Sequence, residues 1–167
     1  MGDILYTIGH SNVQADDLLK LLIDKGIKVL VDVRSIPHSE YTPWFDKDEL
    51  ARMLDSNNIM YLYMGDLLGG KPADKSCYRD GRPDYNLIRE KNFYQKGIER
   101  LVNGIVKYPV AIMCSEEDPI KCHRRNLIGL DMYKKGVKII HIRHNGALQE
   151  DDFKTEMLLS AQGSLFA

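Results

Sequence analysis

The clearest indication of the fold class comes from residues 109–125, PVAIMCSEEDPIKCHRR. An apolar run ends at Cys114, an acidic loop follows, and the pair Asp118-Pro119 then predicts the start of a helix. Asp118 would cap this helix, and Cys122 and His123 would lie about one turn into it. The order of strand, loop and helix is typical of an open α/β sheet, in which ligands bind beyond the carboxyl end of a strand, next to the following helix.

Four other apolar runs have the length and composition of strands, at residues 4–8, 27–33, 59–64 and 137–142. Helical periodicity covers residues 16–25, 46–56, 92–107 and 119–135, and a short amphipathic piece follows at 153–159. Residues 65–90 have no clear period and predict a long connection that is functional or mobile. Strands that alternate with helices indicate a parallel sheet with right-handed crossovers. We therefore predict a single-domain, three-layer α/β fold over residues 1–167, with a mainly parallel sheet of about five strands and helices on both faces.

Length, charge and cysteine content limit the class of protein. A chain of 167 residues can bury about two-thirds of its surface in one domain without disulfides. Lysine and arginine number 23 against 24 aspartates and glutamates, and the formal charge of −1 excludes a strongly basic nucleic-acid coat. Three cysteines, an odd number, favour a reducing compartment over a disulfide framework. Because no apolar run reaches the length of a membrane span and no signal pattern opens the chain, we expect a cytoplasmic protein without a membrane partner.

Polar residues of reactive types lie at the carboxyl ends of four of the five predicted strands. They are His10 and Ser11, then Arg34 and His38, then Cys114 and Glu116, and finally His141, Arg143 and His144. Parallel strands place their carboxyl ends on one edge of a sheet, so we expect these side chains to meet there. A single histidine at a strand end is more often structural, whereas several reactive residues on one edge favour a functional site.

Cys114 is the first candidate for a nucleophile. Backbone N–H groups of the following loop and helix, helped by Arg124 or Arg34, would lower the pKa of its thiol, whereas the acidic loop would favour the neutral thiol. A cysteine at a strand end can equally be a small core residue. Cations near a helix N-terminus are unfavourable unless an anion binds, so Arg124 is expected to hold an anion. Arg125 is expected to be an ordinary solvated arginine.

The sequence does not indicate a metal or a cofactor. Soft ligands are available from Cys114, Cys122 and the histidines expected near them, but the spacing is not Cys-x-x-Cys and no second cysteine pair exists. Neither a Walker-type phosphate loop nor a G-x-G-x-x-G motif follows a strand, which argues against a nucleotide cofactor.

Five segments of the chain resemble the family called domain of unknown function 488. They are YTIGHS at 6–11, VDVRSIPHS at 31–39, LGG at 68–70, the motif C-x-E-x-x-P-x-x-C-H-R at 114–124, and HI at 141–142. The resemblance spans nearly the whole chain and implies an α/β fold with a site at the motif positions, but it implies no particular reaction. Residues 31–34 also resemble the second-strand segment of rhodanese-type sulfurtransferases, although 114–124 is too long and too acidic to form the compact loop of those enzymes.

These observations lead to an enzyme hypothesis and two alternatives. The expected catalytic residues are Cys114, Cys122, His123, Glu116 and His10. The residues expected to bind an anionic small molecule or nucleotide-like substrate are Arg34, Arg124, Ser11, His38 and His141. The reaction would be a cysteine-dependent transfer or hydrolysis. The first alternative is a non-catalytic nucleic-acid or nucleotide-binding module, formed by Tyr78, Arg79, Arg82, Tyr85 and Arg89. The second is a redox sensor in which Cys114 and Cys122 are oxidised reversibly.

Overall fold

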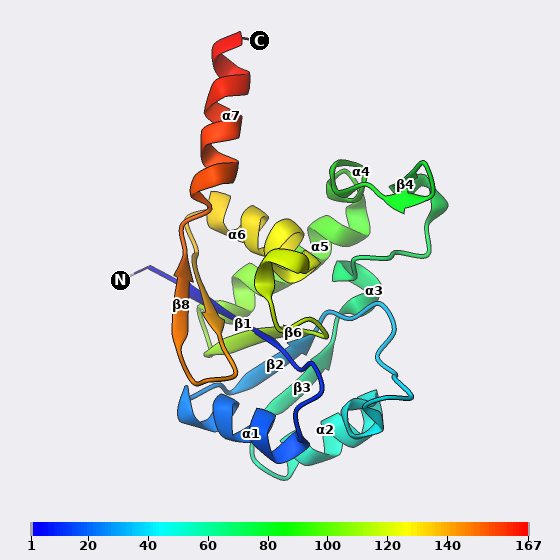
Figure 1. The fold of residues 1–167 in the computed structure, drawn as a ribbon, viewed down its shortest axis with the longest axis vertical. Helices are drawn as coiled ribbons and strands as arrows, with labels where there is room; N and C mark the ends of the chain where they lie inside the picture. Colours follow the sequence, from blue (N-terminus) through cyan, green and yellow to red (C-terminus); the bar gives the residue numbers. More distant parts are fainter. Residues whose placement is uncertain (1, 167) are drawn as a thin grey trace.

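Six strands form one central sheet in the computed structural model, which describes residues 2–166 (Figure 1). They are β1 (Ile4–Gly9), β2 (Val29–Asp32), β3 (Met60–Tyr63), β6 (Val110–Cys114), β7 (Lys138–Ile142) and β8 (Leu148–Asp151). Their order across the sheet is β3-β2-β6-β1-β7-β8. The first five in this order are parallel, and β8 pairs with β7 in the antiparallel direction. The predicted α/β class and mainly parallel sheet are therefore confirmed.

Helices cover both faces of this sheet, again as predicted (Figure 1). On one face, α1 (Ala15–Asp24) and α2 (Lys47–Asp55) contribute Leu18, Leu22, Leu50 and Leu54 to a buried cluster. On the other face, α5 (Asn92–Ile105) and α6 (Leu130–Lys134) contribute to a second buried cluster. The apolar residues of α1 and α5 recur at helical spacing, so each of these helices buries one stripe against the sheet.

The sheet has one strand more than the five predicted. β8 reads Leu-Gln-Glu-Asp, and three of its four residues are exposed. It lies at the edge of the sheet, where backbone hydrogen bonds to β7 hold it on one side only. An edge strand of this kind needs no apolar run, and a prediction from apolar runs therefore missed it.

The helix predicted over residues 119–135 is divided into three parts. A single 3-10 turn spans Pro119–Lys121, and the carboxylate of Asp118 accepts a hydrogen bond from the backbone N–H of Ile120 at 3.1 Å. Cys122 is then extended (φ −126°, ψ 143°), a π-helix spans Arg124–Gly129, and α6 follows. The prediction that Cys122 and His123 lie one turn inside a helix was wrong, because the Asp-Pro signal starts a helical turn but does not determine how far the helix continues.

The connection at residues 65–90 consists of short regular elements. They are α3 (Gly65–Leu68), a 3-10 turn (Lys75–Cys77), the hairpin of β4 (Tyr78–Arg79) and β5 (Arg82–Pro83), and α4 (Tyr85–Arg89). Each element is too short to produce a periodic pattern in the sequence. The connection brings Lys71 and Tyr85 to the cavity described below.

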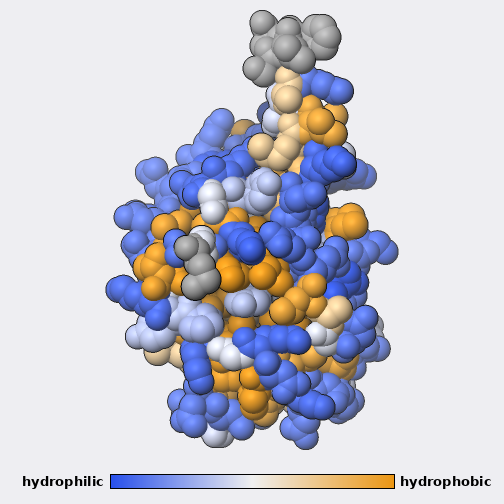
Figure 2. Space-filling view, turned by 90° about the vertical axis from the view of Figure 1, so that its left-hand side faces the viewer, coloured by the Kyte–Doolittle hydropathy of each residue, from blue (hydrophilic) through white to orange (hydrophobic). Residues whose placement is uncertain are grey.

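The last helix, α7 (Lys154–Phe166), extends away from the rest of the chain (Figures 1 and 2). The consecutive residues Met157, Leu158 and Leu159 are all exposed, and Figure 2 shows apolar side chains on this projecting helix. Because consecutive residues point in different directions around a helix, these three apolar side chains do not form one apolar face. The prediction of an amphipathic segment at 153–159 was therefore wrong. Within residues 2–166, no helix has the length and apolar character needed to cross a membrane.

Candidate functional site

A cavity of about 610 Å³ lies beyond the carboxyl ends of β1, β2 and β6. Seven of the ten site residues expected from the sequence line it, namely His10, Arg34, His38, Cys114, Glu116, Cys122 and His123. The other three, Ser11, Arg124 and His141, lie outside its lining. The structure thus brings seven of these side chains together at the sheet edge where ligands bind in open α/β folds.

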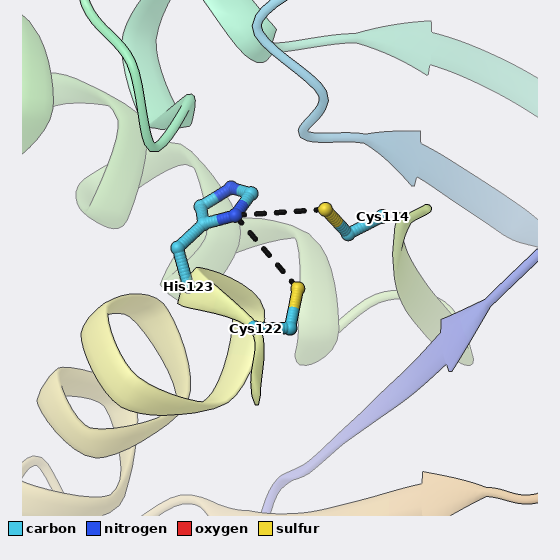
Figure 3. Close-up of side chains that lie close together, drawn as sticks. All are labelled: Cys114, Cys122 and His123. Atoms are coloured by element: carbon cyan, nitrogen blue, oxygen red, sulfur yellow. Dashed lines mark hydrogen bonds between the residues drawn. The ribbon is translucent and has the colours of Figure 1, made fainter. Parts of the chain in front are cut away.

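Cys114, Cys122 and His123 form the centre of this site (Figure 3). Nδ1 of His123 lies 3.5 Å from Sγ of Cys114 and 3.8 Å from Sγ of Cys122. Nε2 of the same ring lies 3.0 Å from the backbone carbonyl oxygen of Val33. Because a carbonyl oxygen only accepts hydrogen bonds, Nε2 carries the proton of the neutral ring, and Nδ1 presents its lone pair to the two sulfur atoms.

The environment separates the pKa values of the two thiols. The pKa of Cys114 is lowered to about 7, first by the hydrogen bond from the thiol of Cys122 and then by the backbone N–H of Ser115 and the charge of Arg124, while burial opposes the shift. The pKa of Cys122 is raised to about 12, because its thiol is bonded to Cys114 and because it is buried. Of the two cysteines, Cys114 is therefore the one that ionises first, and Cys122 remains a thiol.

Arg124 fixes the acidic loop that joins Cys114 to Cys122. Its guanidinium is fully buried and donates to the carbonyl oxygens of Glu116 and of Glu117, the latter at 2.9 Å, and to Oγ1 of Thr7 at 3.2 Å. A residue engaged in this way has no free donors directed at the cavity. The expectation that Arg124 holds an anion therefore does not fit its position, because the π-helix turns its side chain toward the sheet instead.

Two glycines permit close backbone approach around the site. A Cβ atom on Gly9 would lie 1.6 Å from the carbonyl oxygen of Glu116, so only glycine at this position lets the acidic loop dock on the end of β1. A Cβ atom on Gly70 would lie 2.8 Å from Cγ of His123. Gly70 therefore lies directly against the imidazole ring and helps to hold it.

Arg34 lines the cavity with its charge already paired. Its guanidinium donates to both carboxylate oxygens of Asp32, at 2.9 and 2.8 Å, and to the carbonyl oxygen of Phe45 at 2.8 Å. Its third nitrogen, Nη1, lies 3.3 Å from Nε2 of His10. Nδ1 of His10 donates to the carbonyl oxygen of Ser11 at 2.7 Å, which leaves Nε2 to accept from Arg34. Ser11 thus supports the site through its backbone.

We expect His10 to make the stability of the fold depend on pH. Burial lowers its pKa from 6.5 to about 4, and the charge of Arg34 adds to this effect against the opposing bond to Ser11. Between these two values the unfolded chain binds a proton that the folded chain does not, so stability is lost as the pH falls from 6.5 to 4. Replacing His10 by glutamine should remove up to about 3 kcal/mol of this loss.

Urea unfolding of the two proteins at several pH values measures this effect of His10. The free energy of unfolding of the His10→Gln variant should fall less steeply than that of the wild type between pH 6.5 and 4, and the two curves should run parallel above pH 7. A constant difference between them over the whole range would contradict the assignment.

His141 and Arg125 belong to a polar cluster outside the cavity. His141 is fully buried between Oγ1 of Thr7, at 2.6 Å from Nδ1, and the carboxylate of Asp151, at 2.8 Å from Nε2. Arg125, expected to be solvated, pairs with Asp151 at 2.5 Å and with Glu156 at 2.6 Å. These contacts connect β1, β7, β8 and α7, so His141 and Arg125 hold these elements together.

Nine of the sixteen residues that line the cavity were not predicted as parts of this site, and four of them have polar side chains of particular interest. Ser35 follows Arg34, Lys71 and Tyr85 come from the 65–90 connection, and Lys121 comes from the turn before Cys122. The Gly-Gly pair before Lys71 was a signal of close packing, whereas nothing in the sequence distinguished Tyr85 from other surface tyrosines. Burial raises the pKa of Tyr85, and the nearby cysteines add to the shift.

The two alternative functions stay predictions. Of the expected nucleic-acid surface, Arg89 pairs with Asp131 at 2.8 Å, the hydroxyl of Tyr78 donates to a backbone carbonyl at 2.8 Å, and Tyr85 lies in the cavity. For the redox alternative, Cys114 and Cys122 are both free, and their sulfur atoms lie within 4.8 Å of each other.

Fold and site together define an α/β protein with a cysteine–histidine cluster at the carboxyl edge of a parallel sheet. The family described as Domain of unknown function DUF488 matches residues 14–130, more than half of the chain, and the chain belongs to this family. The matched segment contains Arg34 and the whole Cys114–His123 cluster but not β1 or β7, so it is shorter than the resemblance expected from the sequence. No curated protein and no solved structure matches the chain.

Proposed function

We propose that the chain is an enzyme that acts on an anionic small molecule or nucleotide-like substrate through Cys114. The observation that carries this proposal is the 3.5 Å separation between Sγ of Cys114 and Nδ1 of His123 in the lining of the cavity. His123 is in turn held by the carbonyl oxygen of Val33. A nucleophile, a base within reach and a third group that orients the base are the parts that activate nucleophiles on many unrelated folds.

In the proposed reaction, the thiolate of Cys114 attacks an electrophilic atom of the substrate. A bond forms between Sγ and this atom as the bond to the leaving group breaks, and the leaving group takes a proton from Nδ1 of His123. This proton is the one that His123 receives when it deprotonates Cys114. Water in a hydrolase, or a second substrate with an O–H or N–H group in a transferase, then gives its proton to Nδ1 of His123 as it displaces the sulfur. This step restores the thiolate of Cys114 and the proton on His123.

Positive side chains around the cavity support the choice of an anionic substrate. Lys71 and Lys121 are exposed in its lining, and Arg34 contributes a guanidinium whose charge is balanced by Asp32. Among the described residues that line the cavity, Glu116 is the one with a carboxylate. The volume of about 610 Å³ falls within the range of small-molecule sites. The local charge thus favours an anion although the whole chain is nearly neutral.

The rate at which iodoacetamide alkylates Cys114, followed by mass spectrometry as a function of pH, tests the activated thiolate. We expect a midpoint near pH 7 in the wild type, because the pKa of Cys114 is about 7. Replacing Cys122 by alanine removes the thiol that stabilises the thiolate, so the midpoint should move toward the ordinary value of about 8.5 and labelling at pH 6.5 should slow by about tenfold.

The matched control for this labelling is Cys77→Ala, since Cys77 is a buried cysteine outside the cavity. The Cys77→Ala variant should leave the pH dependence of Cys114 alkylation unchanged. A wild-type midpoint above pH 8 would show that Cys114 is an ordinary thiol and would remove the basis of the proposed reaction.

A further inference from the structure

The ligand atoms of Cys114, Cys122 and His123 are spaced as they would be around a tetrahedral metal ion. The two sulfur atoms and Nδ1 all lie within 4.8 Å of one another. With Zn–S bonds of about 2.3 Å and Zn–N bonds of about 2.0 Å, tetrahedral angles place sulfur and nitrogen about 3.5 Å apart. The observed separations are 3.5 and 3.8 Å, so both sulfur–nitrogen pairs have the spacing of zinc ligands.

The groups around these atoms also fit metal binding. Metal-binding histidines almost always donate their second ring N–H to a carbonyl or a carboxylate, and Nε2 of His123 donates to the carbonyl oxygen of Val33. The backbone N–H of Arg124 donates to Sγ of Cys122 at 3.5 Å, and the backbone N–H of Ser115 is bonded to Cys114. Hydrogen bonds of this kind stabilise the thiolate form that a metal requires.

The local backbone explains why the spacing of the cysteines in the sequence did not indicate such a site. Cys122 is extended and His123 begins the helix, so two consecutive side chains converge on Cys114 at the end of β6. Cys114 and Cys122 are eight positions apart in the sequence, which differs from the Cys-x-x-Cys pairs typical of zinc sites. All three residues line the cavity, so a fourth coordination position would face the space where a substrate or water can enter.

We infer that Cys114, Cys122 and His123 bind one Zn²⁺ ion per chain, with the fourth position open to the cavity. Two thiolates and one imidazole are ligands that select zinc over magnesium or calcium. The inference does not rest on the reaction proposed above. The two uses compete for the same atom, because Sγ of Cys114 is not free to form a bond to a substrate while it is bound to Zn²⁺.

The test is a titration of the full chain, reduced and freed of metal with a chelator, first with Co²⁺ and then with Zn²⁺ under anaerobic conditions. One Co²⁺ per chain should produce the visible bands of a tetrahedral site and a sulfur-to-cobalt charge-transfer band, and Zn²⁺ should displace it. The variants Cys114→Ser, Cys122→Ser and His123→Ala should each weaken Zn²⁺ binding at least about 100-fold, whereas Cys77→Ala should bind as the wild type does.

Each result of this titration decides the question. A wild type that gives no charge-transfer band, or a band that survives unchanged in Cys114→Ser, would overturn the inference, and neither result can arise from a variant that fails to fold. Zn²⁺ should also slow alkylation of Cys114 in the wild type. If the metal-free thiol labels with a midpoint near pH 7 but Zn²⁺ does not bind, the metal inference fails and the proposed enzyme function stands.

Discussion

Replacing Cys114 by serine is expected to lower turnover of the substrate at least about a thousandfold. A serine hydroxyl has nearly the same size as the thiol but does not ionise near neutral pH, so the position at the end of β6 is kept and the nucleophile is lost. Turnover is measured with the purified chain against panels of phosphate esters, thiosulfate and nucleosides. The variant Cys122→Ser should lose less activity, because Cys122 only stabilises the thiolate of its neighbour.

The control for this comparison is again Cys77→Ala, which leaves the cavity unchanged and should keep the wild-type turnover. Full activity in both Cys114→Ser and Cys122→Ser would rule out a covalent mechanism through either sulfur. In that case the cavity and its lysines would still describe an anion site, but the chemistry would have to come from other groups.

Replacing Gly9 by alanine is expected to lower the free energy of unfolding by at least about 4 kcal/mol, which is large for the addition of one methyl group. The added Cβ atom would lie 1.6 Å from the carbonyl oxygen and 2.4 Å from the carbonyl carbon of Glu116. These are backbone atoms, so no side chain can rotate away to relieve the contact. Either β1 or the acidic loop must move, and the loop is held by Arg124 and Arg143.

The matched control is Gly104→Ala in α5, where an added Cβ atom meets no atom within 4 Å. This variant should be more stable by up to about 1 kcal/mol, because alanine favours a helix over glycine. Urea unfolding measures both variants. A Gly9→Ala protein as stable as the wild type would mean that the loop does not dock closely on β1.

The strands of the parallel sheet could be predicted because a strand that is covered on both faces consists mostly of apolar residues. Val110–Cys114 is an example, since all five of its residues are buried. β8 has no such run, and its pairing depends on the chain turning back after β7. His10, Arg34 and Cys114 could be predicted as cavity residues because they lie at the carboxyl ends of strands that were predicted to be parallel.

Some residues expected in the cavity lie outside it, because the order of the strands does not determine the direction of each side chain. Position near the carboxyl edge does not fix the direction of a side chain, and His141 points into a buried cluster with Asp151 instead of the cavity. The direction of Arg124 depends on the π-helix that it begins, for which the sequence has no known signal. Lys71 and Tyr85 reach the cavity through tertiary packing of short elements, which periodicity cannot detect.

The π-helix also bears on how such a site can arise or disappear. A π-helix is an α-helix with one residue wound into it, and single-turn examples are frequent at functional sites. Removing one residue from Arg124–Gly129 would restore the α-helix and rotate His123 by about 100° relative to the buried side of α6. The gain or loss of a single codon could therefore assemble or dismantle the cluster of Cys114, Cys122 and His123 while the rest of the sheet stayed as it is.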